Sequence, residues 1–113
     1  MNKPKHKIQH PLQWLYVTAS SRDEANQIAK TLVTERLVAC ANILGEVQSV
    51  YWWDGHVQDD QEVALVLKTR KDLVSQATQR ILALHSYDCP CIVALDIKGG
   101  SPEYLNWIAK ETL

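Results

Sequence analysis

The dipeptide Asp54-Gly55, set between apolar residues, predicts a two-residue β-hairpin turn, because both turn positions need a positive φ angle. One strand is expected before the turn, over residues 41–53 with an interruption near Gly45, and a second after it, ending near Thr69. At about 3.3 Å per residue, such strands reach over roughly 30 Å. A typical strand has only about five or six residues, so the hairpin is expected to project beyond its own domain.

The two-residue turn also determines which residues of the hairpin face one another. It places Trp52-Trp53 opposite His56-Val57. Further from the turn, the same register puts the apolar Val47 opposite the charged Glu62 on one face of the hairpin. A β-bulge near Asp59-Asp60, which adds one unpaired residue to a strand, would remove this mismatch.

The chain before the hairpin predicts a strand followed by a helix. Residues 12–18 are apolar on both faces, which favours a strand covered on both sides. Ser21 and Glu24 have the spacing of a capping box, which satisfies two unpaired backbone donors at a helix start. This helix is expected to run to about Arg36, with an apolar stripe formed by Ala25, Ile28, Ala29, Leu32 and Val33.

The chain after the hairpin predicts a helix, a strand and a short last helix. A helical stripe extends over residues 72–84, and a largely apolar strand follows over residues 91–97. Ser101 as N-cap and Pro102 at the first helical position open the last helix. Its buried positions are expected to be Tyr104, Leu105 and Ile108.

The predicted order of elements is therefore β-α-β-β-α-β-α. The first six match the α+β arrangement called ferredoxin-like, or split βαβ, an antiparallel sheet with two helices on one face. A chain of 113 residues has the size of one domain. We expect a single domain over residues 11–113, a mobile basic tail over residues 1–10, and a sheet whose second face is open.

Charge and cysteine content limit the classes of function. Lys and Arg number 12 and Asp and Glu 13, which gives a formal charge of -1. This balance disfavours a protein that binds the phosphate backbone of nucleic acids. The three cysteines show no disulfide-framework spacing. Residues 1–10 do not resemble a secretory signal and no segment is long enough to span a bilayer, so we expect a cytoplasmic protein without membrane contact.

Tyr51, Trp52 and Trp53 lie directly before the turn, at the tip of the expected hairpin. Burial of one aromatic side chain is worth roughly 1.5–3 kcal/mol, and three exposed together would form an aggregation-prone patch. Packing against another copy of the same chain avoids this exposure, and aromatic residues are enriched in such interfaces. Homo-oligomerisation is therefore predicted. The alternative is a tip that folds back onto its own sheet.

Four motifs resemble those of the CutA family and together span about residues 15–108. They are LVACANI at residues 37–43, SVYWWDG at residues 49–55, Glu62-Val63 followed by LKTR at residues 67–70, and YLNWI at residues 104–108. The resemblance implies a homotrimer of ferredoxin-like protomers whose hairpins clasp neighbouring subunits. It also implies a non-enzymatic role in divalent metal ion tolerance and response, with copper as a reported ligand and no cofactor required for the fold.

The candidate metal ligands are His85, Cys89 and Cys91, in the segment HSYDCPC at residues 85–91. Soft ions such as Cu(I) prefer thiolate and imidazole ligands, and this segment holds both. Packing of free cysteines as small apolar side chains is the alternative. The resemblance implies further copper ligands at positions held here by Val17 and Leu84, so His85 alone is retained from that set.

A second candidate site consists of Trp52, Glu62, Lys68 and Tyr87. The resemblance implies that these polar and aromatic positions line a cleft between subunits, and such a cleft could hold a small polar molecule or an ion. The alternative is a structural ion pair of Glu62 and Lys68 that fixes the register of the subunits.

Two other functions stay open at this point. One is a signalling trimer like the PII proteins, which bind small molecules, although those insert a long mobile loop where this chain has a two-residue turn, and no Gly-rich phosphate loop is present. The other is a small hydrolase such as an acylphosphatase, which a shared fold alone does not support. No catalytic pairing of Ser, His, Asp and Cys side chains can be assembled from the sequence.

Overall fold

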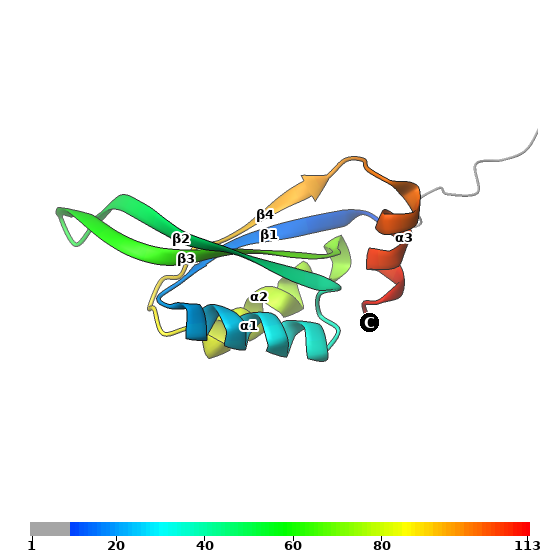
Figure 1. Cartoon of the computed structure of the whole chain (residues 1–113), viewed down its shortest axis with the longest axis horizontal. Helices are drawn as coiled ribbons and strands as arrows, with labels where there is room; N and C mark the ends of the chain where they lie inside the picture. Colours follow the sequence, from blue (N-terminus) through cyan, green and yellow to red (C-terminus); the bar gives the residue numbers. More distant parts are fainter. Residues whose placement is uncertain (1–9) are drawn as a thin grey trace, which may run out of the picture.

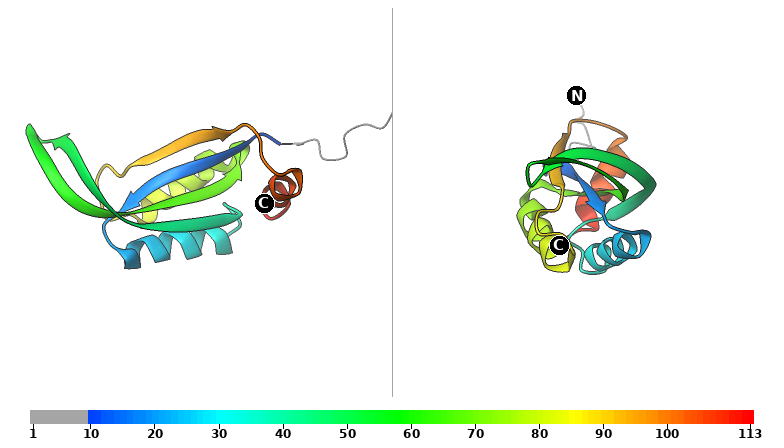
Figure 2. Two further views of the ribbon diagram at one scale, coloured as in Figure 1. Left: turned by 45° about the horizontal axis from the view of Figure 1, so that its top comes forward. Right: turned by 90° about the vertical axis from the view of Figure 1, so that its left-hand side faces the viewer.

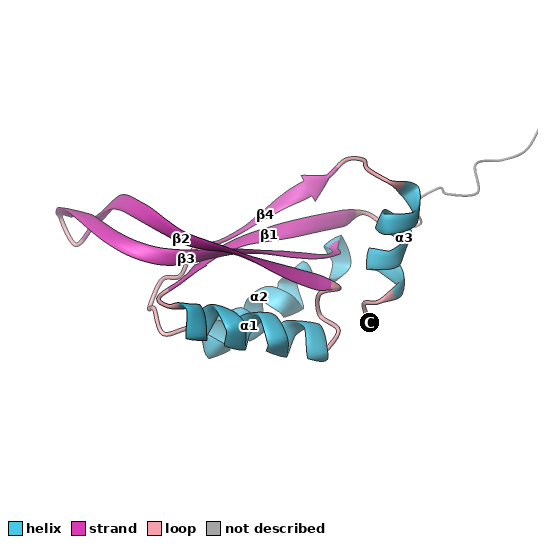
Figure 3. Cartoon of the chain, in the orientation of Figure 1, coloured by secondary structure: helices cyan, strands magenta, loops and turns pink. Residues whose placement is uncertain are grey.

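The computed structural model describes residues 10–113, so most of the predicted tail over residues 1–10 lies outside the described residues. Figures 1 and 3 show the arrangement of the helices and strands. In chain order the elements are β1 (Leu12–Ala19), α1 (Arg22–Thr34), β2 (Cys40–Trp53), β3 (His56–Arg70), the 3-10 turn η1 (Lys71–Leu73), α2 (Val74–Leu84), β4 (Ile92–Ile97) and α3 (Pro102–Lys110).

The four strands form one sheet in the order β2-β3-β1-β4, and every neighbouring pair is antiparallel. Helices α1 and α2 cover one face of this sheet, and α3 lies at the end opposite the hairpin tip (Figure 1). The predicted mixed α+β class with an antiparallel sheet is thus confirmed. None of the helices in residues 10–113 is long and apolar enough to cross a membrane.

The core lies between the sheet and the two helices that cover it. Alternation along β1 and β3 sends every second side chain towards the helices, as the apolar pattern predicts. Seven large side chains at this interface are almost completely buried: Leu15, Val17, Ile28, Leu32, Leu65, Leu67 and Ile81. On the other face of the sheet, α3 packs only at the end beside Leu12 and Ile97, so Val93 and Leu95 of β4 are 50% and 39% exposed there.

The hairpin has the predicted turn and register. Asp54 and Gly55 adopt φ angles of 53° and 75°, and Trp52-Trp53 pair with His56-Val57. The two long strands carry the tip well past the helices (Figure 2), and the described chain measures 61 × 24 × 22 Å.

The predicted bulge near Asp59-Asp60 is wrong. The register shift lies between Ile43 and Gly45, where Leu44 is the extra residue, and Val47 does face Glu62. Without this shift, Ile43 would point away from the helices; with it, Ile43 pairs with Leu65 and packs against the core. Gly45 permits the bulge because its φ of 115° is one that other residues rarely adopt.

Helix α1 begins as predicted but ends earlier. The Ser21 side chain accepts a hydrogen bond from the Glu24 backbone N–H at 3.1 Å. The Glu24 carboxylate accepts in return from the N–H of Ser20, one residue before the expected partner, at 2.9 Å. The helix ends at Thr34 rather than near Arg36, because Arg36 takes a positive φ of 60°.

Helix α3 buries two of its three predicted positions. Leu105 and Ile108 pack with Leu12 in a small second core. Tyr104 is 41% exposed, so its predicted burial is wrong. Its hydroxyl lies 3.4 Å from Sγ of the half-buried Cys40.

Candidate functional site

The four predicted cleft residues do not meet within one chain. Glu62 and Lys68 share the β3 face that points away from the helices, but they lie six positions apart, or roughly 20 Å along a strand. Trp52 belongs to the hairpin tip and is 73% exposed. Tyr87 lies in the loop between α2 and β4. The chain therefore carries these side chains at three places along its long axis.

Glu62 and Tyr87 are the pair that the structure does bring together. Glu62 is only 8% exposed, and within residues 10–113 we find no hydrogen bond or ion pair to its carboxylate. Burial, together with the negative charge of Glu62, raises the pKa of Tyr87. The same two causes raise the pKa of Cys91, against a hydrogen bond with Thr18 that lowers it. The charge of Glu62 thus acts on a phenol and a thiol where the hairpin leaves the body.

Further out on the hairpin, Tyr51 binds Asp60, a diagonal neighbour on the facing strand. The Tyr51 hydroxyl donates to the Asp60 carboxylate at 2.6 Å. This hydrogen bond, followed by smaller effects, raises the pKa of Tyr51 to about 12. Tyr51 therefore stays protonated and serves as a donor throughout the neutral range.

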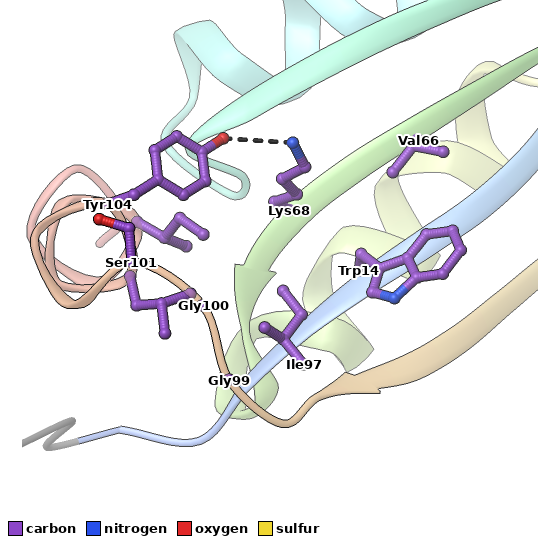
Figure 4. A pocket seen from close by; sticks show the side chains of 10 residues that line it. Trp14, Val66, Lys68, Ile97, Gly99, Gly100, Ser101 and Tyr104 are labelled. Carbon is purple, nitrogen blue, oxygen red and sulfur yellow. Dashed lines mark hydrogen bonds between the residues drawn. The ribbon is translucent and has the colours of Figure 1, made fainter.

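Lys68 belongs to a different surface, shown in Figure 4. Its Nζ donates to the Tyr104 hydroxyl at 3.2 Å and lies 5.3 Å from the centroid of the Tyr104 ring. These residues border an open pocket of about 380 Å³ between the sheet and α3, whose apolar lining is Trp14, Val66, Ile97, Leu105 and Ile108. The sequence analysis did not find this pocket. Strand alternation, which puts Trp14 and Lys68 on one face, was the available signal.

His85 is held entirely by its own chain. Its side chain is fully buried, and Nε2 lies 2.8 Å from the Thr18 carbonyl oxygen. A carbonyl only accepts, so Nε2 carries the proton and donates. Nδ1 accepts from the Tyr87 backbone N–H at 3.1 Å. Both ring nitrogens are therefore engaged, and the ring packs against Tyr87 at 4.7 Å between centroids.

The three predicted metal ligands are not equivalent in the structure. Cys89 and Cys91 are free and exposed, whereas His85 is buried. In the part of the chain that the structure describes, no three His, Cys, Asp or Glu side chains are placed to hold a metal ion together. The assignment of His85, Cys89 and Cys91 as metal ligands stays a prediction.

Glu24 fixes the loop that carries these residues. Its carboxylate accepts from the Ser86 backbone N–H at 2.9 Å and from both the N–H and the hydroxyl of Ser20, and it lies 3.7 Å from His85 Nδ1. Burial alone would raise the pKa of Glu24, but the hydrogen bonds together outweigh it and lower that pKa. The sequence analysis identified Glu24 only as a helix cap.

Replacing Glu24 with glutamine is expected to destabilise the protein at neutral pH by about 1–2 kcal/mol, because charge-assisted hydrogen bonds are lost. Since the folded-state pKa of Glu24 lies below the ordinary glutamate value of 4.5, this stabilisation is present above pH 4.5 and disappears as the pH falls through the folded-state pKa. Urea unfolding at pH 7 and pH 3 measures it. The exposed Glu103, replaced likewise, serves as the control; an equal Glu24→Gln effect at both pH values would contradict the assignment.

Comparisons with known proteins identify the family. The family model described as CutA1 divalent ion tolerance protein matches residues 13–111. The divalent-cation tolerance protein CutA of Thermus thermophilus is 45% identical over 96 residues, which cover 85% of this chain and 93% of the relative. The corresponding protein of Pyrococcus horikoshii is 43% identical over 98 residues, covering 87% and 95%.

A longer relative and two solved structures point to the same family. The chloroplastic protein CutA 1 of Oryza sativa is 42% identical over 98 residues, and the match spans 87% of this chain but 55% of the rice protein. The crystal structure of CutA1 from Oryza sativa superposes with a TM-score of 0.91 at 39% identity and covers 95% of this chain and 98% of that one. That of the Thermus thermophilus protein gives 0.87 at 42% identity, covering 89% and 98%. The chain therefore belongs to the CutA1 divalent ion tolerance family.

Proposed function

We propose that this chain is a non-enzymatic homotrimer of ferredoxin-like protomers that binds a divalent metal ion or a small ligand between subunits and supports tolerance of divalent metals, copper among them. The names of its relatives in Thermus and Pyrococcus, divalent-cation tolerance protein, support the link to metals. The surfaces that one protomer leaves uncovered support the assembly.

The exposed hairpin tip is the observation that carries the proposal. Trp52 and Trp53 are 73% and 50% exposed, and Val50 and Val57 beside them are 64% and 58% exposed. The tip lies beyond the body of its own domain (Figure 2), so the alternative of a tip folded back onto its own sheet has no support. At roughly 1.5–3 kcal/mol per large apolar side chain, burial against another copy gains several kcal/mol for each protomer.

The open face of the sheet supports closure into a ring. Val93, Leu95 and the apolar pocket beside Trp14 all lie on the side away from α1 and α2. A protomer with two uncovered apolar surfaces, one on a projecting arm and one on its body, suits a head-to-tail contact. Repeated head-to-tail contacts form a closed ring when the rotations between successive copies add up to a full turn.

The proposed ligand site needs more than one subunit. Glu62 is an 8% exposed residue with no hydrogen bond or ion pair to its carboxylate within residues 10–113, while Trp52 and Lys68 lie at other places along the chain. Assembly would bring side chains of a neighbouring copy next to Glu62 and Tyr87. The result would be a cleft with an acid, a phenol and an aromatic wall, suited to an ion or a small polar molecule.

Light scattering of the reduced protein, without and with one equivalent of Cu(I), tests both parts of the proposal. We expect a mass of three 12.8 kDa chains and copper that remains bound through desalting. Replacement of His85, Cys89 and Cys91 together by Gln, Ser and Ser should abolish copper retention. Cys40→Ser, which removes the third thiol of the chain, is the matched control and should leave it unchanged.

The two possible negative results test different parts of the proposal, the assembly and the binding of copper. A monomer would contradict the assembly and, with it, the shared cleft. A trimer that retains no copper would keep the architecture and exclude Cu(I) as the ligand of this chain.

A further inference from the structure

The loop between α2 and β4 carries two thiols around one proline, Cys89-Pro90-Cys91. Both cysteines are free and exposed. Pro90 disfavours a helical conformation of the residue before it, and Cys91 directly precedes β4. Where the backbone is extended, residues two apart project to the same side. Cys89 itself lies in a bend, but two consecutive Cα–Cα steps span no more than about 7.2 Å, so both sulfurs are within reach of one bound atom.

His85 does not complete this pair. Its Nε2 donates to the Thr18 carbonyl, its Nδ1 accepts from the Tyr87 N–H, and its side chain is fully buried. To bind a metal, the ring would have to give up one of these hydrogen bonds and turn towards solvent. A structural zinc ion needs four ligands, and residues 10–113 offer no group of three. The site has two ligands, both sulfur.

We propose that Cys89 and Cys91 form a dithiol site for trivalent arsenic compounds, independent of His85. A trivalent arsenic atom with one organic group has two further bonds, which go to oxygen in water. Thiols can replace the oxygen, so that both of these bonds go to sulfur. When phenylarsine oxide reacts with two thiols, two As–S bonds form, the As–O bonds break, and both thiol protons leave with the oxygen as one water molecule. Arsenic and sulfur keep their oxidation states, so no oxidant or reductant is needed.

The surroundings of the pair favour a neutral ligand over a charged one. Glu62 lies near Cys91, and Asp88 directly precedes Cys89 in the chain. These carboxylates repel anions such as arsenate, whereas trivalent arsenic hydroxides are uncharged at neutral pH.

The spacing of the pair favours a bridging atom over a direct disulfide. An extended step of two residues spans about 6.6–7.2 Å between Cα atoms. This lies at or beyond the upper end of the range for disulfides, about 4.4–6.8 Å. An arsenic atom between the sulfurs adds two bonds of reach and so joins them with less distortion of the loop.

The test uses the full-length reduced protein and phenylarsine oxide, with intact-mass spectrometry as the readout. We expect one adduct per folded chain that survives an excess of a monothiol and is removed by a small dithiol. Cys89→Ser and Cys91→Ser should each lower the apparent affinity by about 10²- to 10⁴-fold, the gain that an intramolecular second bond provides. Cys40→Ser and His85→Gln should bind as the wild type does.

Wild-type affinity in Cys89→Ser or Cys91→Ser, or loss of binding in Cys40→Ser, would overturn the proposal. So would an adduct that forms only after the protein is unfolded. Cu(I) binding, measured on the same samples, separates this site from the proposed function. If the protein retains Cu(I) but does not bind the arsenical, the dithiol site is wrong and the proposed function stands. A His85→Gln variant that loses only Cu(I) supports both.

Discussion

Replacing Trp52 and Trp53 together with glutamate is expected to lower the mass in solution from that of an oligomer to the 12.8 kDa of one chain. Both indoles are largely exposed in the single chain, so the substitution removes nothing from the core. In an assembly it would replace buried aromatic surface with four new carboxylate oxygens per hairpin. The lost burial is roughly 1.5–3 kcal/mol per side chain, and each unpaired charge in an interface adds several kcal/mol more.

Light scattering gives the mass, and circular dichroism shows whether the monomer keeps its helices and sheet. The control is His56→Gln, an exposed position at the same turn that pairs with Trp53 and should leave the mass unchanged. If the double variant keeps the mass of the wild type, the hairpin tip is not part of an interface between copies. If it unfolds, the hairpin contributes to the fold itself, and the exposure seen in one chain does not describe its role.

Local chemistry explains why the hairpin could be predicted in detail. The Asp54-Gly55 turn depends on the φ preferences of two residues, and the pairing of its first neighbours follows from counting. The same holds for the start of α1, where Ser21 and Glu24 act within four residues of one another. In each of these elements the decisive interaction lies within a few residues of sequence.

The predicted position of the β-bulge is wrong because the true position depends on the side-chain alternation of two strands, β2 and β3, far from the turn. The pairing of Val47 with Glu62 suggested a shift near the tip, but this pair is retained. The stronger requirement lies further along, where Ile43 must point to the helices. Two observations together place the extra residue at Leu44. The alternation of β3 shows which of its residues face the helices with Ile43, and Gly45 can adopt the positive φ that the bulge needs.

The arrangement of the candidate residues along the chain could be predicted only in part, for a similar reason. Strand alternation put Glu62 and Lys68 on one face, which is confirmed, but alternation says nothing of their separation along the strand. The loop after α2 follows no periodicity, so the hydrogen bonds that occupy both nitrogens of His85 could not be foreseen. The partner of the Tyr104 hydroxyl depends on how α3 packs on the sheet, which is a tertiary contact.

Replacing Leu65 with alanine is expected to destabilise the folded protein by about 2–5 kcal/mol, the usual cost of removing a buried leucine side chain and leaving a cavity. Leu65 is fully buried on β3, where it pairs with Val17 of β1 and Ile43 of β2. It therefore fills the space between three strands and the helices. Urea unfolding at one fixed chain concentration measures the loss, because dissociation and unfolding are linked in an oligomer.

Leu44→Ala is the matched control, since it removes the same atoms from the neighbouring strand. Leu44 is the extra residue of the bulge and is 62% exposed, so its loss should change the free energy of unfolding by no more than about 0.5 kcal/mol. Equal losses for the two variants would mean that Leu44 is buried by another copy and that the bulge belongs to an interface. A negligible loss for Leu65→Ala would contradict the placement of the core between the sheet and the helices.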